Sequence, residues 1–383
     1  MIYLDNAATT YPKPPMVRQA VEVALRRFGA NPGRSGYPMS MAAAEEVYAC
    51  RKEASEFFGG PGPEGVVFPL NCTQAVNMVL KGWLHPGDHV VVSDLEHNAV
   101  MRPLEALSQR GVTFTAAHVT LGDHDATVDA FRRALTAKTR LVFCTHASNV
   151  CGARIPVERI AALCREYRIP VALDCAQSAG ILPVDMEKMG IDFVCAPGHK
   201  GLYGPMGTGI LIAKDGSQLD TILEGGTGSS SLSMKHPEEM PEHLESGTLN
   251  VPGICGLRAG LRFVREREEK IFRHEMEYIT RLYDRLKNIP QVELYTPRPE
   301  PLYFVPVLSC NIQGLTSEET GAMLARQGIA VRAGLHCAPA AHTAIGTLER
   351  GTVRMAPSAF SNFAEIDRVV SGFLKIIHRN FAK

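Results

Sequence analysis

The sequence has no excess of either charge, no apolar run of membrane-spanning length and no signal peptide. Forty Lys and Arg residues balance forty Asp and Glu residues, and no block of like charge stands out. This balance argues against nucleic acid and membrane surfaces as partners and favours small molecules. The N-terminus lacks the basic start and apolar run of a secretory signal. We therefore expect a cytoplasmic protein.

The ten cysteines include no Cys-x-x-Cys pair, the spacing that structural zinc sites commonly use. A long chain with a cytosolic composition also argues against a disulfide framework. We expect neither a metal site nor structural disulfides. Cys144, Cys164, Cys175 and Cys195 lie in or beside apolar runs, so each is expected to be a reduced, buried, small hydrophobic residue.

The fold class follows from the apolar pattern of residues 65–215. Short apolar runs alternate there with longer amphipathic stretches, as in an open, mostly parallel α/β sheet that is doubly wound. Crossover helices are expected between the strands, at 72–81, 99–109, 127–135 and 157–167. The pattern predicts seven strands, at 66–68, 89–93, 112–118, 140–145, 170–174, 193–196 and 209–213.

The alternation ends at a Gly- and Ser-rich segment, residues 225–250, that is typical of a long functional loop. With 383 residues the chain is long enough for two domains. We expect a large domain at 14–255 and a smaller α+β domain of 1–13 and 256–383. In the small domain we predict a helix over 252–285, a strand at 304–312, a helix at 317–327, strands at 329–333 and 352–355, and a closing helix at 363–378.

Polar side chains follow three of the predicted strands. Asp174 ends one strand, with Gln177 three residues later, while His97 and Lys200 each come just after another. Open α/β sheets bind ligands at the carboxyl ends of their strands. Taken singly, these residues have simpler interpretations, such as a helix-capping aspartate or a solvated loop lysine.

Together, the same four residues meet the requirements of pyridoxal phosphate. This cofactor needs a lysine for a Schiff base, an acid at the pyridine nitrogen, a donor at the phenolic oxygen and a flat group on the ring. Lys200, Asp174, Gln177 and His97 are candidates for these roles. An ionised Asp174 would keep the ring nitrogen protonated and strengthen the electron sink.

The cofactor also needs a phosphate site, and the sequence Asn-Cys-Thr-Gln at 71–74 provides one. It follows a strand and opens a helix, so the free amides around Cys72 and the hydroxyl of Thr73 form an anion site. The segment Glu-Ser-Gly-Thr adds a second hydroxyl, that of Thr248, from this subunit or a neighbouring one.

Seven motifs occur in a characteristic order: Tyr-Leu-Asp-Asn-Ala-Ala-Thr-Thr, Glu-His-Asn-Ala, Ser-Asn-Val-Cys-Gly, Asp-Cys-Ala-Gln, Gly-His-Lys, Glu-Ser-Gly-Thr and Val-Arg-Ala-Gly-Leu-His-Cys-Ala-Pro. In order and spacing the chain resembles the class V aminotransferase-fold enzymes, specifically the cysteine desulfurases. The resemblance extends from Tyr3 to the final helix. It implies pyridoxal-phosphate fold type I and a homodimer with active sites at the subunit interface.

The resemblance also implies site roles. Lys200 would form the internal aldimine and move protons, His97 would stack on the ring, and His199 would contribute to cofactor binding. Asn149 and Arg354 would hold the substrate carboxylate, which a guanidinium can grip through two hydrogen bonds. Chemistry alone leaves Arg354 and Arg332 equal candidates, and the resemblance favours Arg354.

Cys337 decides which reaction is expected. In the resembled enzymes a cysteine at this point attacks the substrate sulfur and becomes a persulfide. A thiolate is a strong nucleophile, and we expect the neighbouring His336 and Arg332 to lower its pKa. The compact segment around Cys337 resembles the group with a short catalytic loop, which usually passes sulfur to an acceptor protein.

Several alternatives stay open at the level of sequence. Selenocysteine lyase activity would use the same residues, whereas an aminotransferase or a carbon–sulfur β-lyase would need no persulfide-forming cysteine. A non-catalytic scaffold is disfavoured because Lys200 and its partners are all present. Pro197 stands where many relatives have a hydroxyl, and Leu335 where a second histidine is frequent. The role of Arg34 is open.

Overall fold

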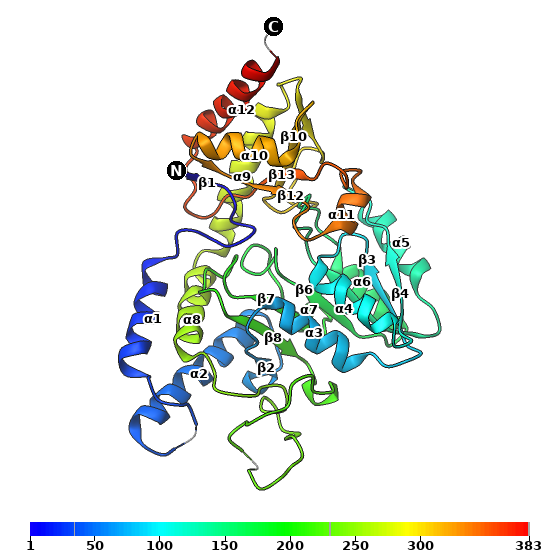
Figure 1. Cartoon of the computed structure of the whole chain (residues 1–383). Coiled ribbons are helices and arrows are strands. Elements are labelled where there is room, and N and C mark those ends of the chain that lie inside the picture. Colours follow the sequence, from blue (N-terminus) through cyan, green and yellow to red (C-terminus); the bar gives the residue numbers. More distant parts are fainter. Residues whose placement is uncertain (34, 230, 382–383) are drawn as a thin grey trace.

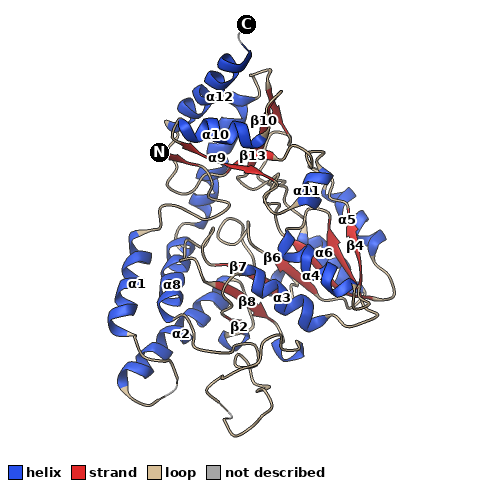
Figure 2. Ribbon diagram, in the orientation of Figure 1, coloured by secondary structure: helices blue, strands red, loops and turns tan. Residues whose placement is uncertain are grey.

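The computed structural model describes residues 1–33, 35–229 and 231–381. Figure 1 shows a large sheet in the lower part of the molecule and a smaller sheet, with α12 and α10, at the opposite end. Figure 2 shows helices on both sides of the large sheet. None of the helices in the described ranges is long and apolar enough to cross a membrane.

The large sheet has the strand order β2-β8-β7-β6-β5-β3-β4. The five strands from β7 to β4 are parallel, whereas β8 runs antiparallel to both β7 and β2. All seven predicted strands belong to this sheet, so the expected fold class is confirmed. Their bounds are β2 (Val66–Val67), β3 (His89–Ser93), β4 (Thr113–Ala117), β5 (Thr139–Thr145), β6 (Val171–Asp174), β7 (Phe193–Pro197) and β8 (Gly209–Ala213).

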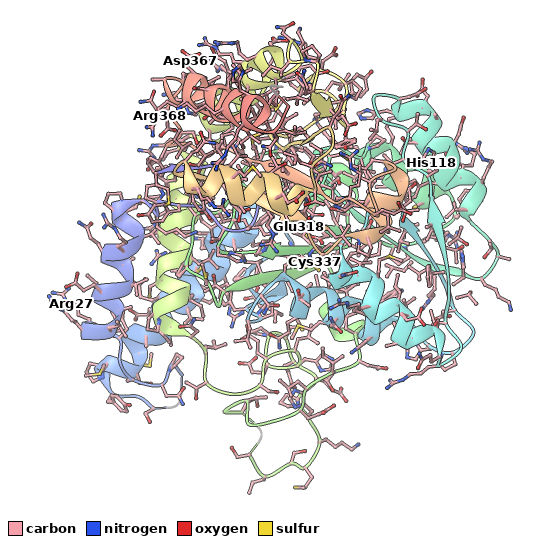
Figure 3. The ribbon with its side chains drawn as sticks, turned by 45° about the horizontal axis from the view of Figure 1, so that its top comes forward. Arg27, His118, Glu318, Cys337, Asp367 and Arg368 are labelled. Carbon is pink, nitrogen blue, oxygen red and sulfur yellow. The ribbon has the colours of Figure 1, made fainter. Side chains whose placement is uncertain are left out.

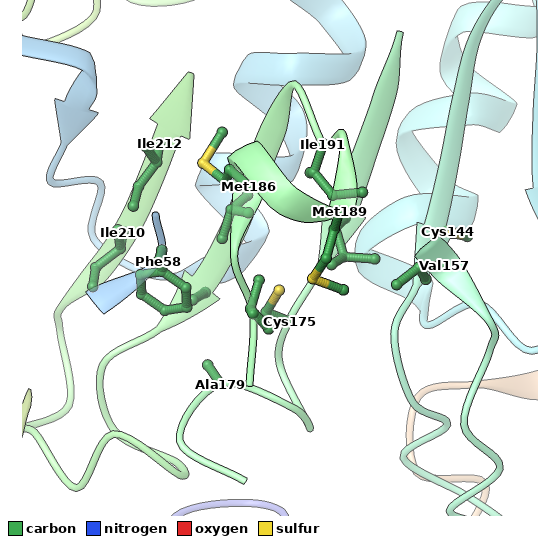
Figure 4. Packing of buried hydrophobic residues seen from close by; sticks show 14 of the residues in the cluster. Phe58, Cys144, Val157, Cys175, Ala179, Met186, Met189, Ile191, Ile210 and Ile212 are labelled. Carbon is green, nitrogen blue, oxygen red and sulfur yellow. The ribbon is translucent and has the colours of Figure 1, made fainter. Parts of the chain in front are cut away.

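Each face of this sheet supports its own apolar core because successive strand residues point to opposite sides. Val91, Val142 and Val194 belong to one cluster, whereas their neighbours Val90 and Phe193 belong to the other. Figure 4 shows the first cluster, where side chains of α7 (Met186–Met189) pack over the strands. The crossover helices are α3 (Cys72–Trp83), α4 (Asn98–Ser108), α5 (His124–Ala134) and α6 (Val157–Glu166).

The remaining elements cover the large sheet or form the small one. Helices α1 (Pro15–Arg27) and α2 (Pro38–Phe57) pack against α8 (Val251–Arg265). The small sheet has the order β12-β13-β10-β9, and β1 pairs separately with β11. The bounds are β1 (Ile2–Tyr3), α9 (Glu268–Leu286), β9 (Val292–Leu294), β10 (Leu308–Ile312), α10 (Ser317–Arg326), β11 (Ile329–Ala330), β12 (Arg332–Gly334), α11 (Pro339–Ala344), β13 (Thr352–Met355) and α12 (Glu365–Phe381).

Three predictions for this part of the chain need correction. The single helix expected over 252–285 is two helices, α8 and α9, because the backbone leaves helical geometry at Arg267. The strand expected from residue 304 begins at Leu308, since Pro306 has no amide hydrogen for a ladder. The strand expected at 329–333 divides between two sheets, as β11 pairs with β1 and β12 pairs with β13. The division into two domains stays a prediction, with its boundary inside α8.

Candidate active site

The predicted strand-end residues converge where the parallel strands finish. Asp174 is the last residue of β6 and lies in register with Thr145 of β5 and Cys195 of β7. Lys200 lies three residues beyond β7, and His97 lies at the start of α4, four residues beyond β3. The charges of Asp174 and Lys200 both act on His97, so the three side chains share one site.

Lys200 stands in a polar but poorly hydrated position. Burial lowers the pKa of its amine, and the positive charge of Arg354 adds to that shift, while the carboxylate of Asp174 opposes it. Two glycines let its loop lie tightly against the segment that follows β6. A Cβ on Gly201 would lie 2.3 Å from the carbonyl oxygen of Ala179, so a larger residue would push the lysine loop away.

Residues near the N-terminus hold this loop from the other side, a role that sequence reasoning missed. Lys13 donates to the carbonyl oxygen of His199 at 2.6 Å and to the Thr10 hydroxyl at 2.7 Å. Thr10 in turn donates to the carbonyl of Lys200 at 3.0 Å. The motif containing Thr10 was recognised in the sequence, but nothing in it indicated which backbone atoms it would contact. The carbonyl of His199 thus anchors the loop, while its Nδ1 is buried without a partner in the described ranges, so the cofactor role of its side chain stays a prediction.

Asp174 is buried and has one oxygen available for a ligand. Its Oδ1 accepts from the amide of Ala176 at 2.8 Å and lies 3.5 Å from the Cys72 sulfur. Its Oδ2 makes no hydrogen bond within the described ranges. Because the residue as a whole is buried, a cation or a donor that reaches this oxygen would stabilise the carboxylate. A protonated pyridine nitrogen would be such a donor.

His97 and Gln177 are oriented by backbone atoms. The Nδ1 of His97 accepts from the amide of Ala99 at 3.0 Å, which leaves the proton of the neutral ring on Nε2. Burial lowers the pKa of His97, so the neutral form is favoured. Gln177 donates to the carbonyl of Ala7 at 3.0 Å and lines a small cavity with Lys200.

The expected phosphate site lies at the start of α3. Asn71 caps the helix by accepting from the amide of Gln74, while the amides of Cys72 and Thr73 have no partner among the described residues. These two donors suit an anion. Thr248 lies elsewhere, beside Asn31 in a hollow that also contains Gln74, so its contribution from a neighbouring subunit stays a prediction. Arg34 lies outside the described residues.

The two predicted carboxylate ligands are joined to each other and to the Cys337 segment. Arg354 is buried and donates to Asp5 at 3.0 Å and to the carbonyl of Asn149 at 2.9 Å, while its Nε has no partner within the described ranges. The side chain of Asn149 donates to the carbonyl of His336 at 2.8 Å. The buried Nε of Arg354 is thus a donor that a ligand carboxylate would satisfy.

Cys337 is the one exposed residue among ten cysteines, and the nine others are buried as expected. It lies at the mouth of the site, in a hollow that also contains His97 and Thr73. The backbones of His336 and Cys337 both have positive φ, 50° and 58°, and the amide of Asn98 donates to the carbonyl of Cys337 at 2.7 Å. Cys337, the predicted nucleophile, is thus held in a strained, hydrogen-bonded turn.

One expectation for Cys337 is wrong. His336 cannot act as a cation that lowers the pKa of the thiol, because burial lowers its own pKa to about 2. Its Nε2 lies 2.9 Å from the Thr352 hydroxyl, and its ring lies beside that of His342. His336 is therefore a neutral structural residue beneath the turn. The proposed influence of Arg332 stays a prediction.

The residues present fit pyridoxal phosphate. Lys200 is an amine whose lowered pKa favours the nucleophilic neutral form, and Asp174 has an oxygen, Oδ2, without a hydrogen bond in the described ranges. His97 offers a flat neutral ring between them and Cys337, and the start of α3 offers amides for a phosphate. Each of these features exists in the folded chain before any ligand is bound.

Comparisons with known proteins agree with this geometry. The model of the family described as aminotransferase class-V matches residues 2–369. A "probable cysteine desulfurase" of Methanothermobacter thermautotrophicus is 33% identical over 95% of this chain and 92% of its own length. A "probable cysteine desulfurase" of Mycolicibacterium paratuberculosis is 32% identical over 99% of this chain, which spans 55% of that longer protein.

Solved structures with the same fold are also similar. The apo structure of a cysteine desulfurase from Thermococcus onnurineus superposes with a TM-score of 0.91 at 28% identity, covering 99% of this chain and 95% of that one. The cysteine desulfurase CsdA of Escherichia coli superposes with a TM-score of 0.86 at 26% identity, covering 98% and 94%. Such coverage extends the likeness to both sheets.

Proposed function

The chain belongs to the aminotransferase class-V family, and on that premise we propose that it is a pyridoxal-phosphate-dependent cysteine desulfurase. It would convert L-cysteine to L-alanine and retain the sulfur as a persulfide on Cys337. The observation that carries this proposal is the position of Cys337, the exposed cysteine in a hollow shared with His97 at the mouth of the Lys200 site. The reaction of an aminotransferase or a β-lyase requires no persulfide-forming thiol at this position.

The cofactor would be held by Lys200, Asp174, Gln177 and His97, with its phosphate at the amides of Cys72 and Thr73. Pyridoxal phosphate, when bound, supplies an electron sink that stabilises negative charge on the substrate. Asp174 would keep a proton on the ring nitrogen through its free Oδ2. Arg354 and Asn149 would orient the substrate carboxylate, and the free Nε of Arg354 supports this role.

Proton transfer would rest with Lys200 and His97. The amine of Lys200, with its lowered pKa, is suited to accept a proton from the substrate Cα and later return it to carbon. The Nε2 of His97, which carries the proton of the neutral imidazole, would exchange it with the substrate. Burial favours the uncharged forms of both groups.

Sulfur transfer would follow from the exposed sulfur of Cys337. Its Sγ attacks the sulfur of the bound substrate, so a sulfur–sulfur bond forms as the carbon–sulfur bond breaks. The electron pair of the broken bond, with protons returned to carbon, completes L-alanine. The products are L-alanine and the persulfide of Cys337, from which the sulfur passes to an acceptor.

We also propose a homodimer in the cytoplasm. Helix α2 exposes Met39, Met41 and Tyr48, each close to half exposed, and such an apolar surface is suited to burial by a second copy. The hydroxyl of Thr248 would then be available to the site of the other subunit. Sedimentation analysis of the purified protein tests the assembly directly.

The test of the reaction compares wild type with Cys337→Ala after both are loaded with pyridoxal phosphate. With L-cysteine and a reductant, wild type should form alanine and sulfide in equal amounts, and the variant should form neither. Cys255→Ala, a matched change at a buried cysteine in α8, should keep the activity. Activity that survives in Cys337→Ala, or pyruvate and ammonia in place of alanine, would instead establish a β-lyase.

A further inference from the structure

A hollow of about 350 Å³ lies beside Cys337 on the outer side of the active site. Its walls come from α3 and α4, and we call it the Cys337 groove. Thr73, Asn77 and Lys81 follow one another at four-residue spacing, so they lie along one face of α3 over about 12 Å. Arg102, on α4, belongs to the same groove. Cys337, labelled in Figure 3, belongs to the segment that follows β12 and lines the groove together with these helices.

The groove is positively charged and has no acidic lining residue. Lys81 and Arg102 are exposed, and within the described ranges neither makes an ion pair or a side-chain hydrogen bond. Burial and, to a smaller extent, the charge of Arg102 lower the pKa of His97, so Arg102 acts on the catalytic end of the groove. Unpaired cations in a concave surface attract an anion.

The groove is separate from the expected substrate carboxylate site. Arg354 and Asn149 lie behind Cys337, within the site, and neither lines the groove. Cys337 is exposed and lines the groove together with His97, so the groove adjoins the active site. A persulfide on Cys337 would therefore face the groove.

Resting on the proposed desulfurase function, we propose that the Cys337 groove binds the sulfur acceptor as a carboxylate-bearing thiol. Its carboxylate would lie between Lys81 and Arg102 while its thiolate reaches the persulfide. The acceptor thiolate attacks the terminal sulfur, the sulfur–sulfur bond at Cys337 breaks, and Cys337 leaves as a thiolate. The acceptor becomes a persulfide, so atoms and electrons balance without an added oxidant. The volume of the groove suits a small molecule or the tip of a protein segment.

The first experiment does not require desulfurase activity. The thiol of Cys337 is allowed to react with 5,5′-dithiobis(2-nitrobenzoate), which carries carboxylates, and separately with uncharged 4,4′-dithiodipyridine. Lys81→Gln and Arg102→Gln should each slow the anionic reagent by about two- to threefold at low salt and leave the neutral reagent unchanged. Added salt should remove the difference. Cys337→Ala gives the background from the nine buried cysteines.

Arg133→Gln is the matched control, because Arg133 is an exposed arginine on α5 outside the groove. Equal slowing of both reagents in the groove variants, or no change with either, would overturn the proposal. Because this assay reads a thiol exchange, it remains informative if the protein forms no alanine from cysteine. If the protein forms no alanine from cysteine but the groove variants still slow only the anionic reagent, the desulfurase function alone would be overturned.

The second experiment follows persulfide transfer in the active, cofactor-loaded enzyme. Mercaptosuccinate should accept sulfur faster than neutral 2-mercaptoethanol. In the double variant Lys81→Gln/Arg102→Gln, the ratio of the two transfer rates should fall by about tenfold. Saturation by the free thiol would assign the acceptor to a small molecule. Saturation only by a cysteine peptide with acidic flanking residues would assign it to a protein segment, and absence of any preference would refute the inference.

Discussion

Arg332 and Arg354 lie directly opposite each other in the antiparallel pair of β12 and β13. Their side chains therefore project from the same face of the small sheet. Arg354 is buried and bonded to Asp5 and to the carbonyl of Asn149, whereas Arg332 is half-buried and its side chain makes no hydrogen bond within the described ranges. Two arginines that are equivalent by chemistry thus differ in how firmly they are held.

Arg354→Gln should raise the KM for L-cysteine by about ten- to a hundredfold, because a charged hydrogen-bond pair to the carboxylate is lost. Arg332→Gln should raise it less, since that side chain is not fixed in advance. Arg354→Lys keeps the positive charge but cannot donate two parallel hydrogen bonds. Its increase in KM should therefore lie between those of Arg332→Gln and Arg354→Gln. A larger increase in KM for Arg332→Gln than for Arg354→Gln would reverse the assignment, with thermal unfolding as the check that both variants fold.

Glu96 should make the protein less stable as the pH rises. Its Oε1 accepts from the amide of Thr145 at 2.8 Å and from Ser93, but its Oε2 is buried without a partner, and burial raises its pKa to about 8. The folded state therefore keeps a proton that the unfolded state loses near pH 4.5. The free energy of unfolding should fall through this window, from about pH 4.5 to pH 8, by roughly 1.4 kcal/mol per pH unit from this group.

Glu96→Gln should remove that slope, so the variant gains stability relative to wild type between pH 5 and pH 8. Urea unfolding at several pH values measures the difference. Glu105→Gln, at an exposed position on α4, is the matched control and should leave the slope unchanged. Parallel pH profiles for wild type and Glu96→Gln would mean that Glu96 ionises normally in the folded protein.

Lys13→Met should loosen the cofactor lysine loop. The variant loses the hydrogen bonds to His199 and Thr10, which we expect to cost about 1 to 3 kcal/mol and to speed the loss of pyridoxal phosphate on dialysis. Lys13→Arg, which keeps charged donors, should restore retention in part. Wild-type retention in Lys13→Met would show that the threonines alone hold the loop.

The same variant has a predicted pH dependence. Burial lowers the pKa of Lys13 to about 8, so between pH 8 and the ordinary value of 10.5 the unfolded chain binds more protons than the folded one. The free energy of unfolding of the wild type therefore rises with pH over that range, whereas that of Lys13→Met does not. The difference in free energy of unfolding between the two proteins, measured by urea unfolding, should widen between pH 8 and pH 10.

Asn149→Ala should release the strained turn at Cys337. Without the bond to the carbonyl of His336, the turn relaxes from its left-handed conformation. We expect faster alkylation of Cys337 by uncharged iodoacetamide and a fall in kcat of about tenfold or more, since small misplacements of a nucleophile are costly. Asn288→Ala, an exposed asparagine in the turn after α9, controls for the substitution. If Asn149→Ala leaves the alkylation rate of Cys337 unchanged and only raises KM, Asn149 acts on the substrate carboxylate and does not hold the turn.

Much of the fold was predictable because the signals that define it are local. The seven strands of the large sheet are short apolar runs, and their carboxyl ends place Asp174, His97 and Lys200 at one edge. The small sheet was harder to predict. Residues 329–333 form one apolar run, yet β11 and β12 join different sheets because β1 and β13, from opposite ends of the chain, offer separate partners.

The sequence by itself determined the α/β class and predicted the cofactor residues and a role for Cys337, since each follows from residue type and position in the sequence. Only the tertiary structure decided which groups are charged and how they are held. His336 is neutral because folding buries it against Thr352 and His342. Arg354 is fixed because Asp5, 349 residues away in sequence, lies beside it. Burial and long-range partners are properties of the folded chain, and no local pattern specifies them.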